Sequence, residues 1–139
     1  MSPLLFLLVL EGLSKLLGKA KLEDILEGIK IYERINITHL SVDDVLLFGK
    51  GNIGEWIVYT KLLTLFSKAS RMKISVVKSS FFENISDEEN KAQICEILPY
   101  SMKPLCEGCI YLSYFIKPNH YSKEDWIWLL KKMDTKLED

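Results

Sequence analysis

The sequence contains no apolar run long enough to cross a membrane. The segment SPLLFLLVL at residues 2–10 is followed closely by Glu11 and Lys15, whereas a membrane-spanning helix needs roughly 20 apolar residues. The same segment has no Lys or Arg before it and no spaced small residues after it, and a secretory signal peptide requires both. It therefore indicates neither a membrane anchor nor a signal peptide.

Cysteine, net charge and linker-like sequence are also scarce. Three Cys at scattered positions in 139 residues argue against a disulfide framework and for a reducing compartment. Eighteen basic and nineteen acidic residues leave a net charge of -1, so no overall field favours nucleic acid and any such contact must be local. No repeat or Gly/Ser linker divides the chain, and 48% hydrophobic residues can bury a core, which favours one domain.

The first helix is predicted from the residues at its start. Ser2 is a suitable N-cap, and Pro3 suits the first helical position. Over its first two turns the segment is apolar almost all round, which predicts a helix surrounded by other elements. Because the helix begins at residue 2, this also predicts that a neighbouring element upstream of it is missing. Its predicted apolar face consists of Phe6, Val9, Leu10, Leu13, Leu16 and Leu17.

A β-hairpin is predicted after a polar stretch at residues 19–28. The following segment carries β-branched and apolar residues on both sides of an acidic pair, which is typical of two strands joined by a turn. We assign residues 35–42 and 45–48 to the strands and place Asp43 and Asp44 at or beside the turn.

A second helix is predicted over residues 52–72, followed by a short strand over 73–79 that ends near Lys78. Asn52 caps the helix, with Glu55 three residues later. The predicted buried stripe of this helix is Trp56, Tyr59, Leu63 and Phe66.

Ser86 and Glu89 form another capping box, which predicts a modest helix to about residue 98. Pro99 and Pro104 bracket a predicted loop, and residues 108–118 predict a strand or a tight hairpin.

The last predicted helix begins at Ser122. Asp125 occupies its third position, and Tyr121 is placed to pack against Trp126. The strong apolar face of this helix consists of Trp126, Leu129, Leu130, Met133 and Leu137. Together the elements predict an α+β fold, in which an antiparallel β-hairpin and short strands pack with about four helices.

The acidic pair is the first candidate for chemistry. Two adjacent carboxylates at a tight turn can lie near one point and bind Mg²⁺, which prefers oxygen ligands. An isolated Asp-Asp between two apolar segments is nevertheless a solvated turn roughly nine times in ten. The surrounding sequence therefore decides how the pair is interpreted.

The order of segments along nearly the whole chain resembles the reverse transcriptase of plant LINE-type (non-LTR) retrotransposons. The resemblance is carried by SPLLFLLVLEGLS (residues 2–14), ITHLSVDDVLLFGKG (37–51), KASRMKISVVKSS (68–80), LPYSMKPLCEGCIYLSYFIKP (98–118) and YSKEDWIWLLKKM (121–133).

This resemblance implies a partial polymerase palm and an RNA-directed DNA polymerase, which is a nucleotidyltransferase. It implies that Asp43 and Asp44 bind Mg²⁺ or Mn²⁺, that Lys78 is the basic residue after the palm helix, and that the opening helix packs beneath the incoming nucleotide and template. The implied partners are an RNA template, a DNA primer and nucleotides. The implied primer-grip residues are Tyr111, Leu112, Tyr114 and Phe115.

The resemblance also divides the chain, as one partial domain, into three regions. Residues 1–85 correspond to the palm core, 86–121 to the palm end with the primer-grip-like hairpin, and 122–139 to a helix connecting toward a missing thumb.

Departures from the family predict that this fragment is truncated and inactive alone. Two-metal catalysis needs further carboxylates, and the family supplies an Asp from a strand before the opening helix. The only Asp before the hairpin here is Asp24, in a polar stretch, and the Gln-Gly segment and the fingers region are also absent. Ser41 alone separates Leu40 from Val42, as though one residue had been lost, so that a bulge is needed to keep the strand in register. In the primer grip, Ser113 replaces the family's usual Gly.

Two further groups of residues have a functional interpretation and a simpler one. Cys95, Cys106, Cys109 and His120 could form a zinc site, but ordinary thiols are roughly nine times more common at such spacing. His39 lies in a predicted strand with no partner Cys or Ser nearby and is predicted to be a packed or edge histidine.

Glycines and lysines also have simple interpretations. Gly49, Gly51 and Gly54 lack the Lys-Ser/Thr of a phosphate loop and are predicted to end the hairpin and open the next helix. Lys131, Lys132 and Lys136 alternate with acidic residues and predict a solvated face.

Two alternatives to a polymerase fragment remain. A secreted or membrane-associated interaction protein would use residues 2–10 as a targeting segment and glycosylate the sequons at Asn36 and Asn84. A small intracellular binding module would act through exposed apolar surface. The polymerase hypothesis predicts an intracellular protein, cytoplasmic or nuclear, that tends to aggregate or pair through exposed core surfaces.

Overall fold

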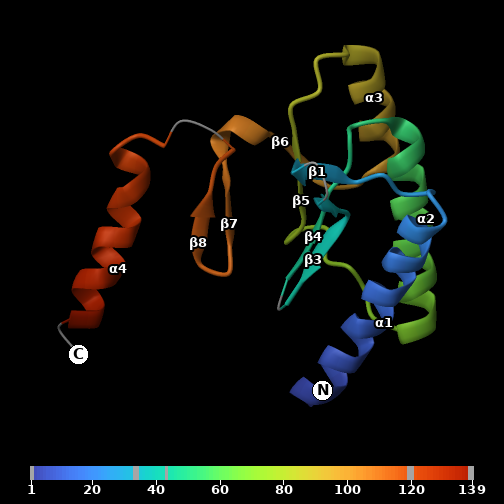
Figure 1. Cartoon of the computed structure of the whole chain (residues 1–139), viewed down its shortest axis with the longest axis horizontal. Coiled ribbons are helices and arrows are strands. Elements are labelled where there is room, and N and C mark those ends of the chain that lie inside the picture. Colours follow the sequence, from blue (N-terminus) through green and yellow to red (C-terminus); the bar gives the residue numbers. More distant parts are fainter. Residues whose placement is uncertain (1, 33–34, 43, 119–120, 138–139) are drawn as a thin grey trace. The chain divides into compact units, whose positions relative to one another are not determined.

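The structure, a computed structural model, describes residues 2–32, 35–42, 44–118 and 121–137 (Figure 1). The chain divides into two compact units, Met1–Lys103 and Pro104–Asp139. Over the described residues it forms four α-helices and four two-stranded sheets, so the predicted α+β class is confirmed. The elements of the first unit are α1 (Pro3–Leu22), β1 (Ile29–Tyr32), β2 (Ile35–Ile37), β3 (His39–Ser41), β4 (Val45–Leu47), α2 (Ile53–Ser70), β5 (Ser80–Glu83), α3 (Glu88–Ile97) and β6 (Ser101–Pro104). Those of the second unit are η1 (Leu105–Glu107), β7 (Cys109–Tyr111), β8 (Tyr114–Ile116), η2 (Glu124–Trp126) and α4 (Ile127–Leu137).

The core of the first unit joins α1, α2 and α3. Leu17, Tyr59 and Ile94, one from each helix, are almost completely buried. Trp56 packs edge-on against Phe81 of β5, with ring centroids 4.7 Å apart. Burying each of these side chains contributes roughly 1.5–3 kcal/mol, and this core fixes the helices on which the hairpins rest. The remaining buried members of the core are Leu13, Ala20, Leu26 and Leu98.

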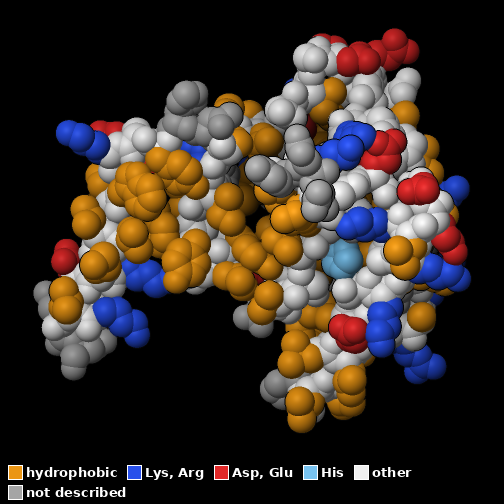
Figure 2. All heavy atoms as spheres, in the orientation of Figure 1, with side chains coloured by type: hydrophobic (Ala, Val, Ile, Leu, Met, Phe, Trp, Pro, Cys, Tyr) orange, Lys and Arg blue, Asp and Glu red, His pale blue; other side chains and the backbone are white. Residues whose placement is uncertain are grey.

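Helix α1 begins as predicted, at Pro3 after the N-cap Ser2. The expectation that its first turns are surrounded is not met within the described chain, because Leu4 and Leu8 are 72% and 68% exposed. Burial along this helix begins at Leu10, where α2 and β3 start to cover it. Figure 2 shows the uncovered apolar side chains at the end where α1 begins. No helix in the described part of the chain is long and apolar enough to span a membrane.

The predicted hairpin is present but shorter than expected. β3 and β4 pair antiparallel, whereas β2 pairs with β1 instead. The predicted single strand over residues 35–42 thus divides into β2 and β3 at Thr38. Thr38 is buried, and its carbonyl oxygen accepts the Phe48 N–H at 2.9 Å. Residues 19–28, predicted as a polar connection, instead supply the last turn of α1 and a short turn before β1. A bulge is found in β1, between Lys30 and Tyr32, and not beside Ser41.

Two predictions for the middle of the chain are wrong. Residues 73–79 do not form a strand: they run through coil into a turn, and Val77 is 96% exposed. Residues 73–78 are exposed, so the β-branched residues among them gain little from extending. The strand comes later, as β5, and it pairs with β6 where a proline-bracketed loop was predicted.

Helix α3 has a different cap from the predicted one. Asp87, not Ser86, is the N-cap, and its Oδ1 accepts the N–H groups of Glu89 at 3.1 Å and Asn90 at 3.4 Å. A carboxylate at this position also interacts favourably with the positive end of the helix dipole, so the helix begins one residue later than expected.

The second unit contains the predicted tight hairpin and last helix. β7 and β8 pair antiparallel through a two-residue turn at Leu112 and Ser113, both with positive φ. At the start of the last helix the Asp125 carboxylate accepts the Ser122 N–H at 2.7 Å, which is one half of the predicted capping box. The N-cap is Lys123, not the predicted Ser122, and the first turn is the 3₁₀ helix η2. The Tyr121 ring packs 5.2 Å from that of Trp126, as predicted.

Candidate functional site

The candidate metal-binding turn connects β3 to β4. Ser41 pairs with Val45 as the last pair before the turn. Asp44 is exposed, and its carbonyl oxygen accepts a hydrogen bond from the Val42 N–H at 3.2 Å. Asp43 lies outside the described residues. The hairpin therefore carries one described acidic residue in its turn, accessible to a cation.

Tyr59 of α2 fastens the base of this hairpin. Its phenolic oxygen lies 3.0 Å from the Thr38 carbonyl oxygen and 2.7 Å from that of Phe48, so one proton is shared between the two strands. Burial raises the pKa of Tyr59 well above its usual range, and the nearby negative charge of Glu55 adds to this. The phenol therefore stays protonated and remains a donor at all ordinary pH values.

His39 has a hydroxyl partner on another element, contrary to the expectation that no Ser lies nearby. Ser14 Oγ of α1 is 2.8 Å from Nε2, and Thr38 Oγ1 is 3.1 Å from Nδ1. Burial lowers the pKa of His39, and the positive charge of Lys21 lowers it further. A neutral imidazole therefore links α1 to β3, as a packed histidine. Ser14 lies 25 positions earlier in sequence, which is why sequence spacing did not reveal it.

Two contacts fix the direction of α1 beside β2 and β3. Ser14 contacts His39, and the Lys21 ammonium donates to the Asn36 carbonyl oxygen. Later residues of the helix thus meet earlier residues of the strands, so the two run antiparallel. The turn that contains Asp44 therefore points toward the N-terminal half of α1 (Figure 1).

Glu55 is a buried carboxylate that joins three segments. Its Oε1 accepts the N–H groups of Glu27 at 3.0 Å and Gly28 at 2.7 Å, and its Oε2 accepts the Lys50 N–H at 2.8 Å. Its own N–H donates to Asn52 Oδ1 at 2.8 Å, which confirms Asn52 as the N-cap of α2. The Glu55 side chain thus holds the turns before β1 and after β4 on the start of α2.

The residues implied as a primer grip all lie in the second unit. Tyr111 is buried, and Leu112 forms the turn with Ser113. Tyr114 contacts Trp128 edge to face, with ring centroids 5.8 Å apart. Phe115 contacts Tyr121 in the same way, at 6.4 Å.

Lys78, implied as a basic residue after the palm helix, is exposed in a turn of the first unit. The lysines of the last helix are exposed at positions 131, 132 and 136, in agreement with a solvated face. Lys132 Nζ lies 4.9 Å from the centre of the Tyr114 ring, a distance that allows a cation–π contact.

Three of the four residues considered for zinc are divided between the two units. Cys95 belongs to α3 of the first unit, and its Sγ lies 3.5 Å from the sulfur of Met102. Cys106 and Cys109 belong to the second unit, and His120 lies outside the described residues. Burial raises the pKa of the Cys109 thiol, which disfavours the thiolate that metals bind. Over the described ranges, no group of three or more His, Cys, Asp or Glu could hold a metal ion.

Glycines and sequons complete the predicted features. β4 ends at Leu47 and α2 begins at Ile53, so the glycines at 49 and 51 do end the hairpin and lead into the helix. In the first sequon, Asn36 is half-buried and Thr38 is 2% exposed, whereas Asn84 of the second is exposed.

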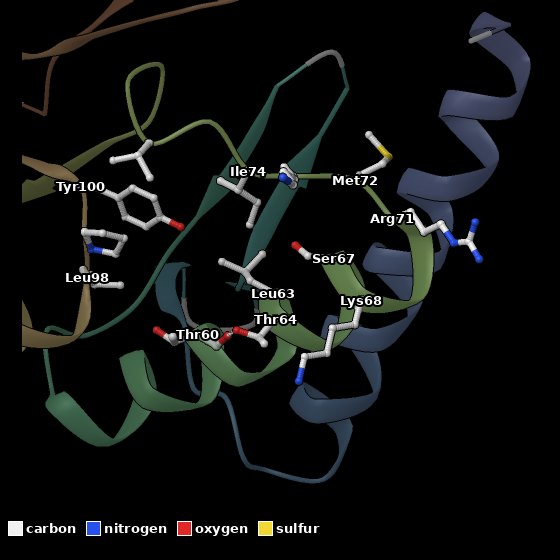
Figure 3. A pocket seen from close by; sticks show the side chains of 13 residues that line it. Thr60, Leu63, Thr64, Ser67, Lys68, Arg71, Met72, Ile74, Leu98 and Tyr100 are labelled. Atoms are coloured by element: carbon white, nitrogen blue, oxygen red, sulfur yellow. Dashed lines mark hydrogen bonds between the residues drawn. The ribbon is translucent and has the colours of Figure 1, made fainter.

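A groove beside the C-terminal half of α2 was not predicted. It has a volume of about 650 Å³, and residues 71–76 and 98–100 complete its lining (Figure 3). Lys68, Arg71 and Lys73 contribute positive charge to it. A signal was present in the sequence, because the 27 residues between Glu55 and Glu83 contain five Lys or Arg and no Asp or Glu.

Comparison with known proteins gave no assignment for these features: no family model matches the chain, and no solved structure matches it.

Proposed function

We propose that this chain is part of a reverse transcriptase domain of the plant LINE-type retrotransposon kind, and that it contributes a palm-type metal hairpin without polymerising DNA by itself. The observation that carries the proposal is the hairpin of β3 and β4, which exposes Asp44 in its turn and has its base fastened to α2. The order of the resembling segments along the chain supports it.

A metal-binding turn needs a rigid base, because small displacements of a ligand weaken a site. The Tyr59 phenol contacts a carbonyl at the start of one strand and another at the end of its partner. His39 adds a second attachment, to α1. Two helices, α2 and α1, thus hold one short hairpin, which suits a turn that must hold carboxylates in place.

The opening helix supports the proposal in a second way. In the family it packs beneath the nucleotide and template, and here α1 runs antiparallel to the segment leading into the hairpin. The exposed leucines at the start of α1 lie on the half of the helix toward which the turn points (Figure 1). We expect this exposed apolar surface to drive pairing or aggregation inside the cell.

Polymerisation would require more carboxylates than the acidic pair provides, because two metal ions must be held. Asp24 does not replace the family's strand-borne Asp, since it lies in the turn after α1 with a φ of 54°. Asp43 and Asp44 are therefore expected to bind Mg²⁺ or Mn²⁺ weakly, and the metal would supply Lewis-acid chemistry only in the complete domain. RNA template, DNA primer and nucleotides remain the partners of that domain.

Paramagnetic Mn²⁺ tests the hairpin directly. Titrating Mn²⁺ into isotopically labelled protein should broaden the amide resonances of Val42, Asp44 and Val45 selectively. The variant Asp43→Asn/Asp44→Asn should lose this broadening. The matched control Asp87→Asn, at an exposed helix cap, should retain it. A turn whose resonances stay sharp in the original chain would rule out a metal-binding hairpin.

Primer extension tests the second part of the proposal. The chain, supplied with Mg²⁺, an RNA template, a DNA primer and deoxynucleotides, should give no product above a no-protein blank. Robust extension that disappears on Asp43→Ala would show that the fragment is an active polymerase after all. The two experiments are independent, so the prediction of a metal site and the prediction of no polymerase activity can be refuted separately.

A further inference from the structure

The groove beside α2 combines an apolar floor with cationic residues in its lining. Leu63 of α2 and Ile74 of the following coil face each other, and Tyr100 projects toward them from the segment before β6 (Figure 3). Leu98 closes the floor. Lys68 and Arg71 lie at the C-terminal end of α2 (Figure 3). A volume of about 650 Å³ is within the range of roughly 300–1,000 Å³ that ligand sites show.

Among the described residues, no carboxylate forms a salt bridge with the cations of the groove, Lys68, Arg71 and Lys73. The described residues that line the groove include no carboxylate. Lys61 and Lys68 line a smaller hollow on the adjoining face of α2, again with no acidic neighbour in the lining.

A structural role accounts for only part of this charge. Cations at the end of a helix interact favourably with its negative end. Lys68 lies in the last turn of α2, and Arg71 is its C-cap. Lys61 is two turns earlier, and Lys73 is beyond the helix. The net charge of the chain is only -1. The groove and the hollow beside it nevertheless contain more cations than interaction with the helix terminus explains.

We propose that this groove binds an acidic peptide segment of a partner protein. Apolar side chains of the peptide lie on the floor made by Leu63, Ile74 and Leu98, and its carboxylates contact Lys68, Arg71 and Lys73. A single-stranded nucleic acid fits less well, because such sites present aromatic stacking platforms along a basic track. This floor is mainly aliphatic, and among the described lining residues Tyr100 is the one aromatic side chain. The proposal does not depend on the polymerase assignment.

Fluorescence anisotropy of the full chain tests it with defined probes. The ligand is a fluorescein-labelled peptide of alternating glutamate and leucine. Its controls are a glutamate–serine peptide, which lacks the apolar side chains, a lysine–leucine peptide, which reverses the charge, and a labelled oligothymidylate. The glutamate–leucine peptide should bind at least tenfold more tightly than any control.

Two variants locate the site. Lys68→Glu/Arg71→Glu reverses two exposed charges and should weaken binding about tenfold or more, since each exposed pair contributes up to about 1 kcal/mol and reversal adds repulsion. Ile74→Ser, at a side chain 37% exposed, should weaken binding without unfolding the chain, as checked by circular dichroism. Lys131→Glu, at an exposed lysine of α4, should leave binding unchanged.

Three outcomes would overturn the proposal. One is equal affinity of the glutamate–leucine peptide for the chain and for Lys68→Glu/Arg71→Glu. Another is that the chain binds the glutamate–serine peptide as tightly as the glutamate–leucine peptide, which would show that the apolar floor does not contribute to binding. The third is tighter binding of oligothymidylate that the same charge reversal abolishes, which would identify the groove as a nucleic-acid site.

Discussion

The Glu55 carboxylate offers the sharpest test of how the first unit is held together. Replacing it with glutamine keeps the size of the side chain but substitutes an NH₂ group for one carboxylate oxygen. Three backbone N–H groups point at this carboxylate, from Glu27, Gly28 and Lys50. An amide oxygen can accept the first two, and the NH₂ group then faces the Lys50 N–H, a donor against a donor.

The magnitude follows from those three bonds. A hydrogen bond to a charged group contributes about 1.5–3 kcal/mol and a neutral one about 0.5–1.5 kcal/mol. Glu55→Gln weakens two bonds from charged to neutral and removes the third at a residue only 4% exposed. We expect the free energy of unfolding to fall by roughly 3.5–6 kcal/mol. That loss lowers the Tm of a unit of this size by about 10 °C or more.

Urea unfolding measures this change. Trp56 is the sole tryptophan in residues 1–103, so a Trp126→Phe/Trp128→Phe background makes fluorescence report on the first unit alone. The matched control is Glu96→Gln on the exposed face of α3, which should change the free energy of unfolding by less than about 0.5 kcal/mol. If Glu55→Gln were as mild as Glu96→Gln, the carboxylate would not be the attachment between the three segments.

Two further changes test other features of the same unit. Gly28→Ala should destabilise by more than about 2 kcal/mol in urea unfolding, because Gly28 has a φ of +64° and an added Cβ would lie 2.3 Å from the Ile37 carbonyl oxygen. The control Gly12→Ala has open space inside α1 and should stabilise by about 0.5–1 kcal/mol, so equal effects would refute the close approach. His39→Gln should flatten the pH dependence: the folded pKa of His39 is lowered from 6.5, so the unfolded chain protonates first below about pH 6.5 and the free energy of unfolding decreases as the pH falls. An unchanged difference between the two chains from about pH 7 to 5 would contradict the buried neutral imidazole.

Local signals in the sequence predicted the elements that depend on neighbours along the chain. Pro3 and Asn52 mark the starts of α1 and α2. The β-branched and apolar residues on both sides of the acidic pair predicted the β3–β4 hairpin. The Tyr121–Trp126 contact was likewise predicted from spacing alone. These features need only a few adjacent residues, so one sequence suffices to predict them.

Predictions failed where partners distant in sequence decide the structure. Residues 73–79 have strand-like composition but no sheet to join, and β5 forms instead because β6 is available. Residues 35–37 leave the hairpin to pair with β1. The Ser14–His39 contact crosses 25 positions and the Glu55–Gly28 contact 27, and no short pattern reveals which elements will meet.

The sequence by itself determined the α+β class, the four helices and an acidic turn between two strands, because helix caps, periodicity and turn residues act locally. Only the tertiary structure decided that this turn is fastened by Tyr59 to α2 and by His39 to α1. It also decided that an acid-free stretch of sequence becomes one wall of a basic groove. Both results depend on which helix face packs against which strand, and burial of the common core of α1, α2 and α3 sets that choice.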